Sequence, residues 1–207
     1  MADLVMLEKD GVRIRVDAAL VAEHVALGWS TDVNWKLTEI QWDDLRYPAA
    51  GINPPGALSD PTRDTSDGRL AFSPTADNVI AVQVQMPHAW LEGSSIRPHI
   101  HWSPTSANTG NVKWQMQYKI ADINGAFPAG WTTDTVLQAG AGVSDQHQIV
   151  SFAPIDMTGL HLSCMLLMLV YRLGSDPADT YTGDAKLNEF DIHFQQNALG
   201  SNEEFYK

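Results

Sequence analysis

From residue 79 onward, the chain is built from short segments in which apolar and polar residues alternate, and this pattern constrains the fold more than any other feature. Val112–Ile120 is the clearest segment, because every second side chain is apolar and the intervening ones are lysine or glutamine. Successive side chains of a β-strand point to opposite faces, so this segment predicts a strand with one face in a core. The expected inward residues are Val112, Trp114, Met116, Tyr118 and Ile120.

The other segments of this part of the chain extend the pattern. Strands are predicted at Val79–Met86, Ile96–Trp102, Gln148–Phe152 and Leu187–Phe194. The run Leu162–Leu173 is apolar on both faces and therefore predicts a central strand. Turns rich in glycine and proline separate these segments, and no helical period occurs between them. The sequence thus predicts a mainly β protein, an antiparallel β-sandwich of the jelly-roll type.

The first 30 residues predict a small unit of their own, with two strands and a helix. An apolar segment at Leu4–Leu7, a turn that contains glycine, and the alternating segment Val12–Val16 predict a β-hairpin. Asp17 is a favourable N-cap for a helix over Ala18–Leu27. A ββα unit of this size buries little apolar surface, so we expect it to dock on a neighbour.

Residues 31–78, between these two parts, predict an irregular arm. The stretch 48–74 is rich in Pro, Gly, Asp, Ser and Thr, and a long loop in a compact protein is commonly a functional segment or an interface arm. Trp35 and Trp42 are expected to anchor the start of the arm to the core. The predicted organisation is a docking module at 1–30, an arm or linker at 31–78, and a sandwich at 79–207 that ends in a polar tail from residue 195.

Charge and cysteine content argue against several classes of protein. The chain has 25 acidic and 13 basic residues, a formal net charge of -12. Binding to nucleic acids or anionic membranes depends on Lys and Arg, so neither partner is expected. The start of the chain does not resemble a signal peptide, and the apolar run Met165–Tyr171 is far shorter than the roughly 20 residues that span a bilayer. Cys164, the single cysteine, lies in an apolar run and predicts a buried free thiol.

A histidine motif in the predicted strand Ile96–Trp102 is the sharpest candidate for a binding site. Gly93 is followed, after five residues, by His99 and His101, which matches the opening of the first cupin motif. Two histidines at i and i+2 of a strand project from one face and can bind one metal ion. The carboxylate that cupins place shortly afterwards is absent, and His193 could complete the site instead. The candidate metal ligands are His99, His101 and His193; the alternative is a polar face that hydrogen-bonds to neighbouring strands or to another subunit.

Known catalytic motifs do not occur in the sequence. It has no Gly-x-Ser-x-Gly nucleophile motif, phosphate-binding loop or dinucleotide fingerprint. Glu189 and Asp191 share a strand face as a candidate acid pair, although such pairs are more typical of a solvated face. We therefore expect no enzyme activity, no catalytic residues and no cofactor other than the candidate divalent metal. Trp90, Trp102 and Trp131, near predicted strand ends, are the candidates for a carbohydrate-binding surface.

Several short motifs resemble those of a family of tailed-phage and prophage virion structural proteins. They are Pro87-His88-Ala89-Trp90, Gly93, Pro98-His99-Ile100-His101-Trp102, Asp191-Ile192-His193 and Gly200-Ser201, and the resemblance extends from Trp35 to Lys207. The ββα unit at the N-terminus resembles a small module that occurs in several phage structural proteins. Both resemblances point to a component of a phage particle.

The resemblance implies a non-enzymatic protein and supplies no catalytic residues. The implied roles are a capsid decoration or cement protein, a head-fibre protein, or a protein of the tail, the neck or a receptor-binding fibre that binds glycans. By analogy with viral jelly rolls, we expect a homotrimer that contacts the major capsid protein or other virion proteins. The expected location is the virion, after synthesis in the host cytoplasm. The alternative from the residues alone is a cupin-like metalloprotein.

Overall fold

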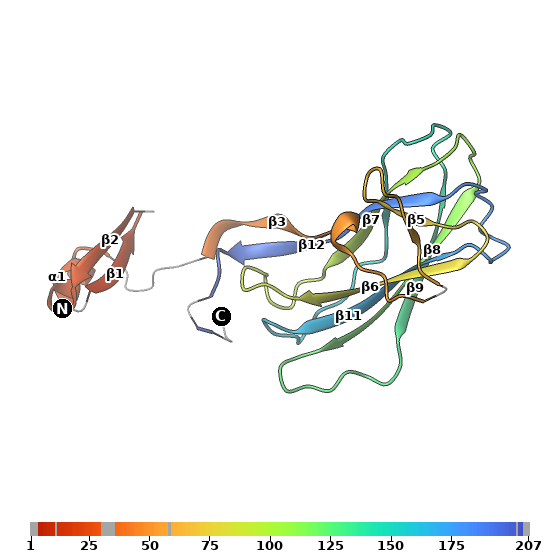
Figure 1. Ribbon diagram of the computed structural model, residues 1–207. Helices are drawn as coiled ribbons and strands as arrows, with labels where there is room; N and C mark the ends of the chain where they lie inside the picture. Colours follow the sequence, from red (N-terminus) through yellow and green to blue (C-terminus); the bar gives the residue numbers. More distant parts are fainter. Residues whose placement is uncertain (1–3, 11, 30–35, 58, 202, 205–207) are drawn as a thin grey trace.

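The computed structural model describes residues 4–10, 12–29, 36–57, 59–201 and 203–204. Within these residues the chain is mainly β, with a small N-terminal ββα unit followed by a β-sandwich (Figure 1). The mainly β fold class predicted from alternation is therefore confirmed. In the described part of the chain, no helix is long and apolar enough to cross a membrane.

The N-terminal unit has the predicted order of elements. Strand β1 (Leu4–Lys9) pairs antiparallel with β2 (Val12–Asp17), and the helix α1 (Val21–Ala26) follows. The first residues of the predicted helix form the separate 3-10 turn η1 (Ala18–Leu20) instead. The α-helix is consequently shorter than the sequence pattern predicts.

Local hydrogen bonding and burial explain this unit. The carboxylate of Asp17 accepts a hydrogen bond from the backbone N–H of Ala19 at 3.0 Å, which is the predicted capping interaction. Leu7 of β1 and Val16 of β2 are buried. Leu27, from the apolar stripe of the helix, remains exposed. The unit therefore has a minimal core and an apolar surface that it does not cover itself.

The sandwich consists of two antiparallel sheets in the described residues. The larger has six strands in the order β10-β7-β12-β5-β4, with β3 paired to the C-terminal part of β12; the smaller has the order β6-β11-β8-β9. The larger sheet contains β3 (Lys36–Pro48), β4 (Thr62–Arg63), β5 (Leu70–Phe72), β7 (Arg97–Pro104), β10 (Gln148–Ser151) and β12 (Ala185–Ala198). The smaller contains β6 (Asp77–Gln85), β8 (Asn111–Ala121), β9 (Thr132–Ala139) and β11 (Met165–Leu173). Figure 1 shows one sheet above the other.

The core lies between the inner faces of the two sheets. Alternate residues along β6, β7 and the first half of β8 are buried there, as the alternation predicts, while Tyr118 and Ile120 in the second half of β8 are partly buried against the core. In β12 the alternation is interrupted by a register shift between Leu187 and Glu189. Three aromatic side chains pack edge to face at its centre: Trp114 contacts Phe72 and Trp102 with ring centroids 5.4 and 5.9 Å apart. Strand β11, predicted to be central from its apolar character on both faces, lies between β6 and β8. Cys164 is fully buried and free, as expected.

The prediction of an irregular arm at 31–78 misses strand β3 and the short strands β4 and β5, whereas much of the described stretch between β3 and β6 is irregular. Strand β3 forms a long antiparallel pair with β12, and β5 pairs with the other end of the same strand. The short turn η2 (Ala49–Gly51) connects β3 to the rest of the stretch. Most of β3 is exposed on both faces, so its pairing comes from backbone hydrogen bonds and needs no apolar alternation. Sequence periodicity therefore missed it.

Trp42 does not anchor this segment to the core. Its side chain is 47% exposed, and the guanidinium of Arg97 lies 4.7 Å from the centroid of its ring. Trp35, the other expected anchor, lies outside the described residues. The loop after β3 is held instead by Arg63, whose guanidinium donates hydrogen bonds to the carbonyl oxygens of Ala49, Ile52 and Gly68. The partly buried Arg63 thus connects three points of the loop region that follows β3, whose composition predicts an irregular structure.

The polar tail predicted from residue 195 begins later than expected. Strand β12 continues to Ala198, which is buried and pairs with Lys36 at the start of β3. Pairing with β3 extends β12 beyond the apolar segment that marked it in the sequence, because backbone hydrogen bonds do not require apolar side chains.

Candidate metal centre

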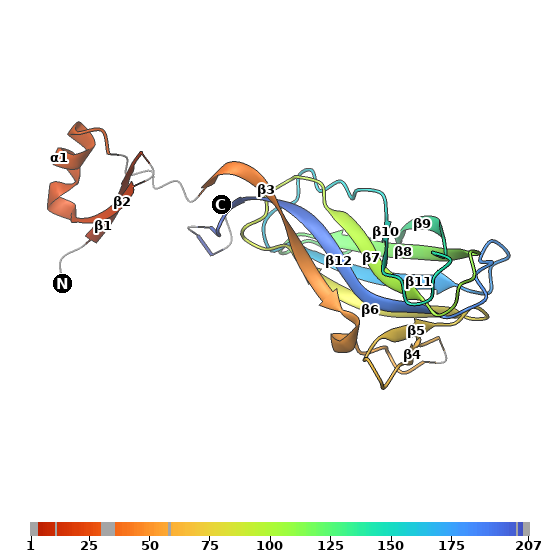
Figure 2. The ribbon, with the colours of Figure 1, turned by 90° about the horizontal axis from the view of Figure 1, so that it is seen from above.

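Four strands present a polar face on the outer side of the larger sheet. Figure 2, viewed from above, shows β3, β12, β7 and β10 side by side. The register places Asp191 of β12 opposite His99 of β7, and His193 of β12 opposite Asp44 of β3. Directly opposed residues in a sheet share a face, so these side chains project together toward solvent.

Asp191 is the centre of this polar face. It is only 3% exposed although it points away from the core, because histidine side chains surround it. Its Oδ2 atom lies 3.2 Å from Nε2 of His193 and 3.4 Å from Nε2 of His101. Its Oδ1 atom lies 4.0 Å from Nδ1 of His99. The three histidines predicted from the sequence, His99, His101 and His193, are therefore brought around one carboxylate.

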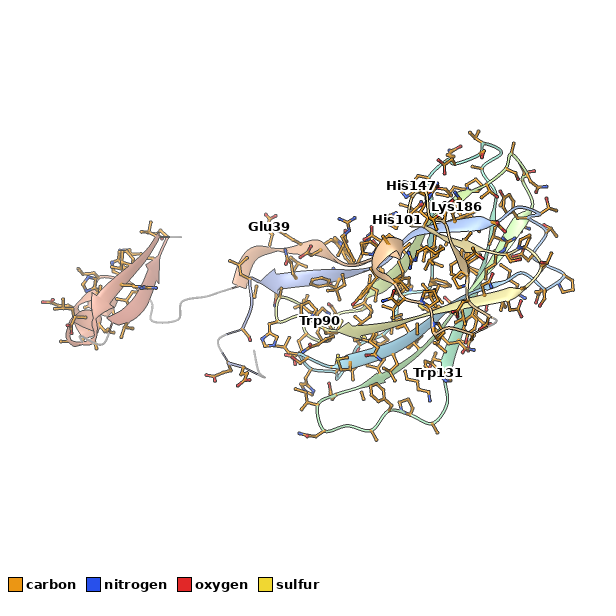
Figure 3. All side chains as sticks on the ribbon, in the orientation of Figure 1. Glu39, Trp90, His101, Trp131, His147 and Lys186 are labelled. Carbon is orange, nitrogen blue, oxygen red and sulfur yellow. The ribbon has the colours of Figure 1, made fainter. Side chains whose placement is uncertain are left out.

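Two further residues complete the surroundings of the cluster. His147, in the loop before β10, approaches His101 with its Nε2 2.8 Å from Nδ1 of His101, and the two rings stack with centroids 5.0 Å apart. Figure 3 shows these two side chains next to each other above the larger sheet. Asp44 of β3 places Oδ1 at 3.2 Å from Nε2 of His193.

The cluster borders a surface pocket of about 520 Å³. The residues that line it are Asp44, Arg46, His101, His147, Ile149, Asn188, Glu189, Asp191 and His193. Glu189 is not free in this pocket, because Arg46 binds its carboxylate with two hydrogen bonds of 2.7 and 2.8 Å. The two carboxylates of the acid pair considered from the sequence therefore have different partners: Glu189 binds Arg46, and Asp191 contacts the histidines. The arrangement differs from two carboxylates that share one substrate bond.

Burial and charge favour neutral imidazole at His99. Burial lowers the pKa of His99, and neighbouring His193 lowers it further, while the carboxylate of Asp191 opposes this shift. A neutral imidazole keeps a nitrogen lone pair that can bind a metal ion. The ligand atoms of His99, Asp191 and His193 all lie within 4.8 Å of one another. Within the described part of the chain, these three residues are accordingly a group that could hold a metal ion.

Sequence reasoning missed the roles of Asp191, Asp44 and His147 in this cluster. A signal existed for Asp191, since it stands at i-2 from His193 on a strand and so shares its face. Asp44 had no such signal, because β3 was not predicted. His147 lies in a loop, where no periodicity indicates the direction of a side chain.

The tryptophans do not assemble the carbohydrate-binding surface that was considered from the sequence. Trp90 and Trp102 are fully buried, and their indole N–H groups donate to the carbonyl of Ser94 and the side chain of Gln138. Trp131 is 39% exposed, and Nζ of Lys119 lies 4.8 Å from its ring centroid. In Figure 3, Trp131 lies on the opposite side of the sandwich from His101 and His147.

The remaining motif residues join two distant parts of the chain. Nδ1 of His88 is 2.5 Å from the hydroxyl of Ser201, and its Nε2 is 3.2 Å from the hydroxyl of Ser163. Trp90 forms an isolated antiparallel bridge with Gln196 at the end of β12. The Pro-His-x-Trp and Gly-Ser motifs therefore meet at one end of the sandwich.

Taken together, these features define an antiparallel β-sandwich with a histidine–aspartate cluster on its outer face. No family model and no curated protein matches the chain. A solved structure with a similar fold is the CBM36-1 domain of a multidomain xylanase from the hindgut metagenome of Trinervitermes trinervoides, with 12% identity, a TM-score of 0.40, and coverage of 72% of this chain and 96% of that one.

Two other solved structures have a comparable similarity. A carbohydrate-binding module CBM36 in complex with calcium and xylotriose has 15% identity and a TM-score of 0.38, over 74% of this chain and 99% of that one. The enzymatically active domain of tailspike protein 4 of bacteriophage CBA120 has 10% identity and a TM-score of 0.31, over 74% of this chain and 19% of that one. At these identities the similarity concerns the β-sandwich fold alone.

Proposed function

We propose that the chain is a non-enzymatic structural component of a tailed-phage particle that assembles as a homo-oligomer. A capsid decoration or cement protein, or a head-fibre protein, is the role that we favour. The proposal depends on where the structure places the motif residues on which the resemblance to phage virion proteins is based. They hold distant segments of the framework together or form the cluster around Asp191.

The contacts of His88 and Trp90, in the Pro-His-x-Trp motif, support a structural role. His88 joins the connection between β6 and β7 to Ser201, near the end of the described chain, and to Ser163, before β11. Trp90 is fully buried at the same end of the sandwich. Motif residues that stabilise the framework, and do not form an active site, are typical of a structural protein.

Exposed apolar residues in the N-terminal unit and on β3 support contact with other subunits. Leu27 of the N-terminal unit is exposed, as are Ile40 and Trp42 of β3. Among the described residues, strand β3 pairs with β12 alone, and its other backbone edge is available to a neighbour. Exposed apolar groups and open strand edges are features through which subunits associate.

The direct test is quantitative mass spectrometry of gradient-purified particles of the phage that encodes the chain. A copy number comparable to that of the major capsid protein is expected for a decoration or cement protein. A much smaller number would assign the chain to the neck, the tail or a fibre instead. Absence from the particles would refute the proposal, and light scattering of the purified chain tests the expected trimer separately.

Carbohydrate binding within a receptor-binding fibre is a second candidate function. The observation that favours it is a group of exposed apolar side chains on the connection between β8 and β9, namely Ile123, Phe127 and Trp131. Aromatic faces at a surface can stack on sugar rings. A glycan array with the oligomeric wild-type chain and a Trp131→Ala variant tests this candidate. Glycan binding that Trp131→Ala abolishes would support it, and absence of binding by wild type would count against it.

A further inference from the structure

Two buried polar atoms of the histidine–aspartate cluster have no hydrogen-bond partner among the described residues. They are Oδ1 of Asp191 and Nδ1 of His99, which face each other at 4.0 Å. Nearly all buried polar atoms in folded proteins are paired, because an unpaired one forfeits its interaction with water. An electron-rich carboxylate oxygen and an imidazole nitrogen aimed at the same place are what a bound cation requires.

We propose that His99, Asp191 and His193 bind a divalent first-row transition-metal ion. Their ligand atoms lie within 4.8 Å of one another, and they come from two adjacent strands whose register holds them in place. Imidazole nitrogen together with carboxylate oxygen is a donor set suited to ions such as zinc, cobalt and iron. This inference does not depend on the proposed function, because the ion would bind to the isolated chain.

The distances in the cluster are close to those of a ligand set. Ligand atoms about 2.0–2.2 Å from a tetrahedral ion are about 3.3–3.6 Å apart. Oδ2 of Asp191 lies 3.2 Å from Nε2 of His193, which is near this value. Oδ1 of the same carboxylate lies 4.0 Å from Nδ1 of His99, so the carboxylate faces one of the two histidines with each oxygen.

A network of protonated histidines is the competing explanation for the cluster. The rings of His99 and His193 have centroids only 4.2 Å apart, so two imidazolium charges there would repel each other. The geometry also does not pair Oδ1 of Asp191 within such a network, because Nδ1 of His99 lies 4.0 Å from it, beyond hydrogen-bond distance, while His101 and His193 face Oδ2. One divalent ion satisfies the carboxylate and both neutral rings at once.

His101 acts in this arrangement as a positioning residue for Asp191. Its Nε2 faces Oδ2, the carboxylate oxygen opposite the one that faces His99. Its Nδ1 is held by His147 at 2.8 Å, which orients the ring. Partners that hydrogen-bond to ligands in this way orient them and tune metal affinity. The ion therefore has three protein ligands, and its remaining positions are open to water or to a group from another subunit.

The test is zinc binding by the full, untagged chain after treatment with EDTA and removal of the chelator. Isothermal titration calorimetry with zinc and elemental analysis are expected to give one ion per chain. Thermal unfolding is expected to shift to a higher temperature with zinc, because a ligand that binds only the folded state stabilises it. A wild-type chain that binds no zinc would overturn the proposal.

Variants identify the ligands. Asp191→Asn and His193→Gln are each expected to weaken zinc binding more than 10-fold and to remove the thermal shift. The matched control is His161→Gln, which changes an exposed histidine paired with Asp122 outside the cluster. His193 is 37% exposed, so its variant should fold even if Asp191→Asn does not. Equal binding by wild type, His193→Gln and His161→Gln would overturn the proposal.

Cobalt separates the ligands from the positioning residue. We expect His99→Gln to abolish the visible absorption spectrum of the cobalt-loaded chain. His101→Gln should leave this spectrum and the stoichiometry unchanged but weaken zinc binding by about 10-fold, as for other residues that orient metal ligands. Loss of the cobalt spectrum in His101→Gln would make His101 a ligand and overturn its assignment as a positioning residue.

Discussion

At the residue scale, Arg172 shows how this sandwich accommodates a charge in its core. Its side chain is fully buried and forms an ion pair of 2.8 Å with the equally buried Asp179. The guanidinium also donates to the carbonyl oxygens of Phe72, Tyr181 and Gly183. Every part of the fork is thus hydrogen-bonded, which offsets the loss of hydration on burial.

Replacement of Arg172 by methionine is expected to lower the free energy of unfolding by about 3–5 kcal/mol, because it leaves Asp179 buried without its partner. Urea denaturation followed by tryptophan fluorescence measures this. The control is Lys113→Met, which removes a partly exposed ion pair with Asp176 and should cost less than about 1 kcal/mol. Similar losses of unfolding free energy in the two variants would show that burial does not make the Arg172–Asp179 pair more costly to break than an exposed pair.

His161 offers a prediction of pH dependence outside the histidine–aspartate cluster. Its Nδ1 lies 2.9 Å from Oδ2 of Asp122, and this hydrogen bond and the carboxylate charge raise the pKa of His161. Since the folded pKa lies above the unfolded one, the pair stabilises the fold below the unfolded pKa, and this contribution is lost as pH rises through the folded pKa.

NMR titration of the His161 ring in wild type should give a pKa above the usual value for histidine. Asp122→Asn is expected to move it back toward about 6.5, the value of an unperturbed histidine. Asp156→Asn is the control, since this carboxylate hydrogen-bonds to Thr158 instead. An unchanged His161 pKa in Asp122→Asn would contradict the prediction.

At the element scale, side chains close the gap between the edges of the two sheets. Edge strand β9 of the smaller sheet faces β10 of the larger one, and Gln138 joins them. Its carbonyl accepts from the indole N–H of Trp102 at 2.7 Å, and its amide donates to the backbone carbonyl of Ile149 at 2.9 Å. From the other side, Gln148 donates to the backbone carbonyl of Ala139 at 3.0 Å. Two sheets without a shared strand are linked in this way at their edges.

Gln138→Leu is expected to lower the free energy of unfolding by about 1–3 kcal/mol, because the buried N–H of Trp102 loses its acceptor. Chemical denaturation measures the change. Gln83→Leu, at an exposed position of β6, is the control and should change stability by less than about 0.5 kcal/mol. A loss no greater than that of the control would show that the link between the edges does not stabilise the sandwich.

At the scale of the whole molecule, the core of the sandwich is independent of the N-terminal unit. The cluster of buried apolar residues begins at Ala49 and ends at Phe194, whereas Leu7 and Val16 are buried within their own unit. Each part thus has its own interior. This division agrees with the proposal that the N-terminal unit serves as a docking module while the sandwich presents the metal-binding face.

Deletion of residues 1–29 is therefore expected to leave the urea midpoint of the sandwich unchanged. The reason is that none of the residues described in this segment belongs to the core cluster of the sandwich. Denaturation followed by the fluorescence of the buried tryptophans reports on the sandwich alone. A midpoint clearly below that of the full chain would show that the two parts unfold as one cooperative unit.

The sequence by itself determined the β class, the ββα unit and the inward faces of the strands. Burial in a strand repeats every second residue, so Ile80, Trp114 and Phe190 could be assigned to the core from local pattern alone. The same reasoning placed His99 and His101 on one outward face. Each of these conclusions depends on neighbours within a few positions of the chain.

Tertiary structure alone decided the pairing of β3 with β12 and the composition of the histidine–aspartate cluster. Alternation says which face a side chain takes, but the partner of a strand and its register depend on the whole fold. Asp191 meets His99, which lies far away in the chain, because β12 and β7 pair in one particular register. His147 joins them from a loop, whose backbone has no period to reveal its direction, so only the folded chain brings the site together.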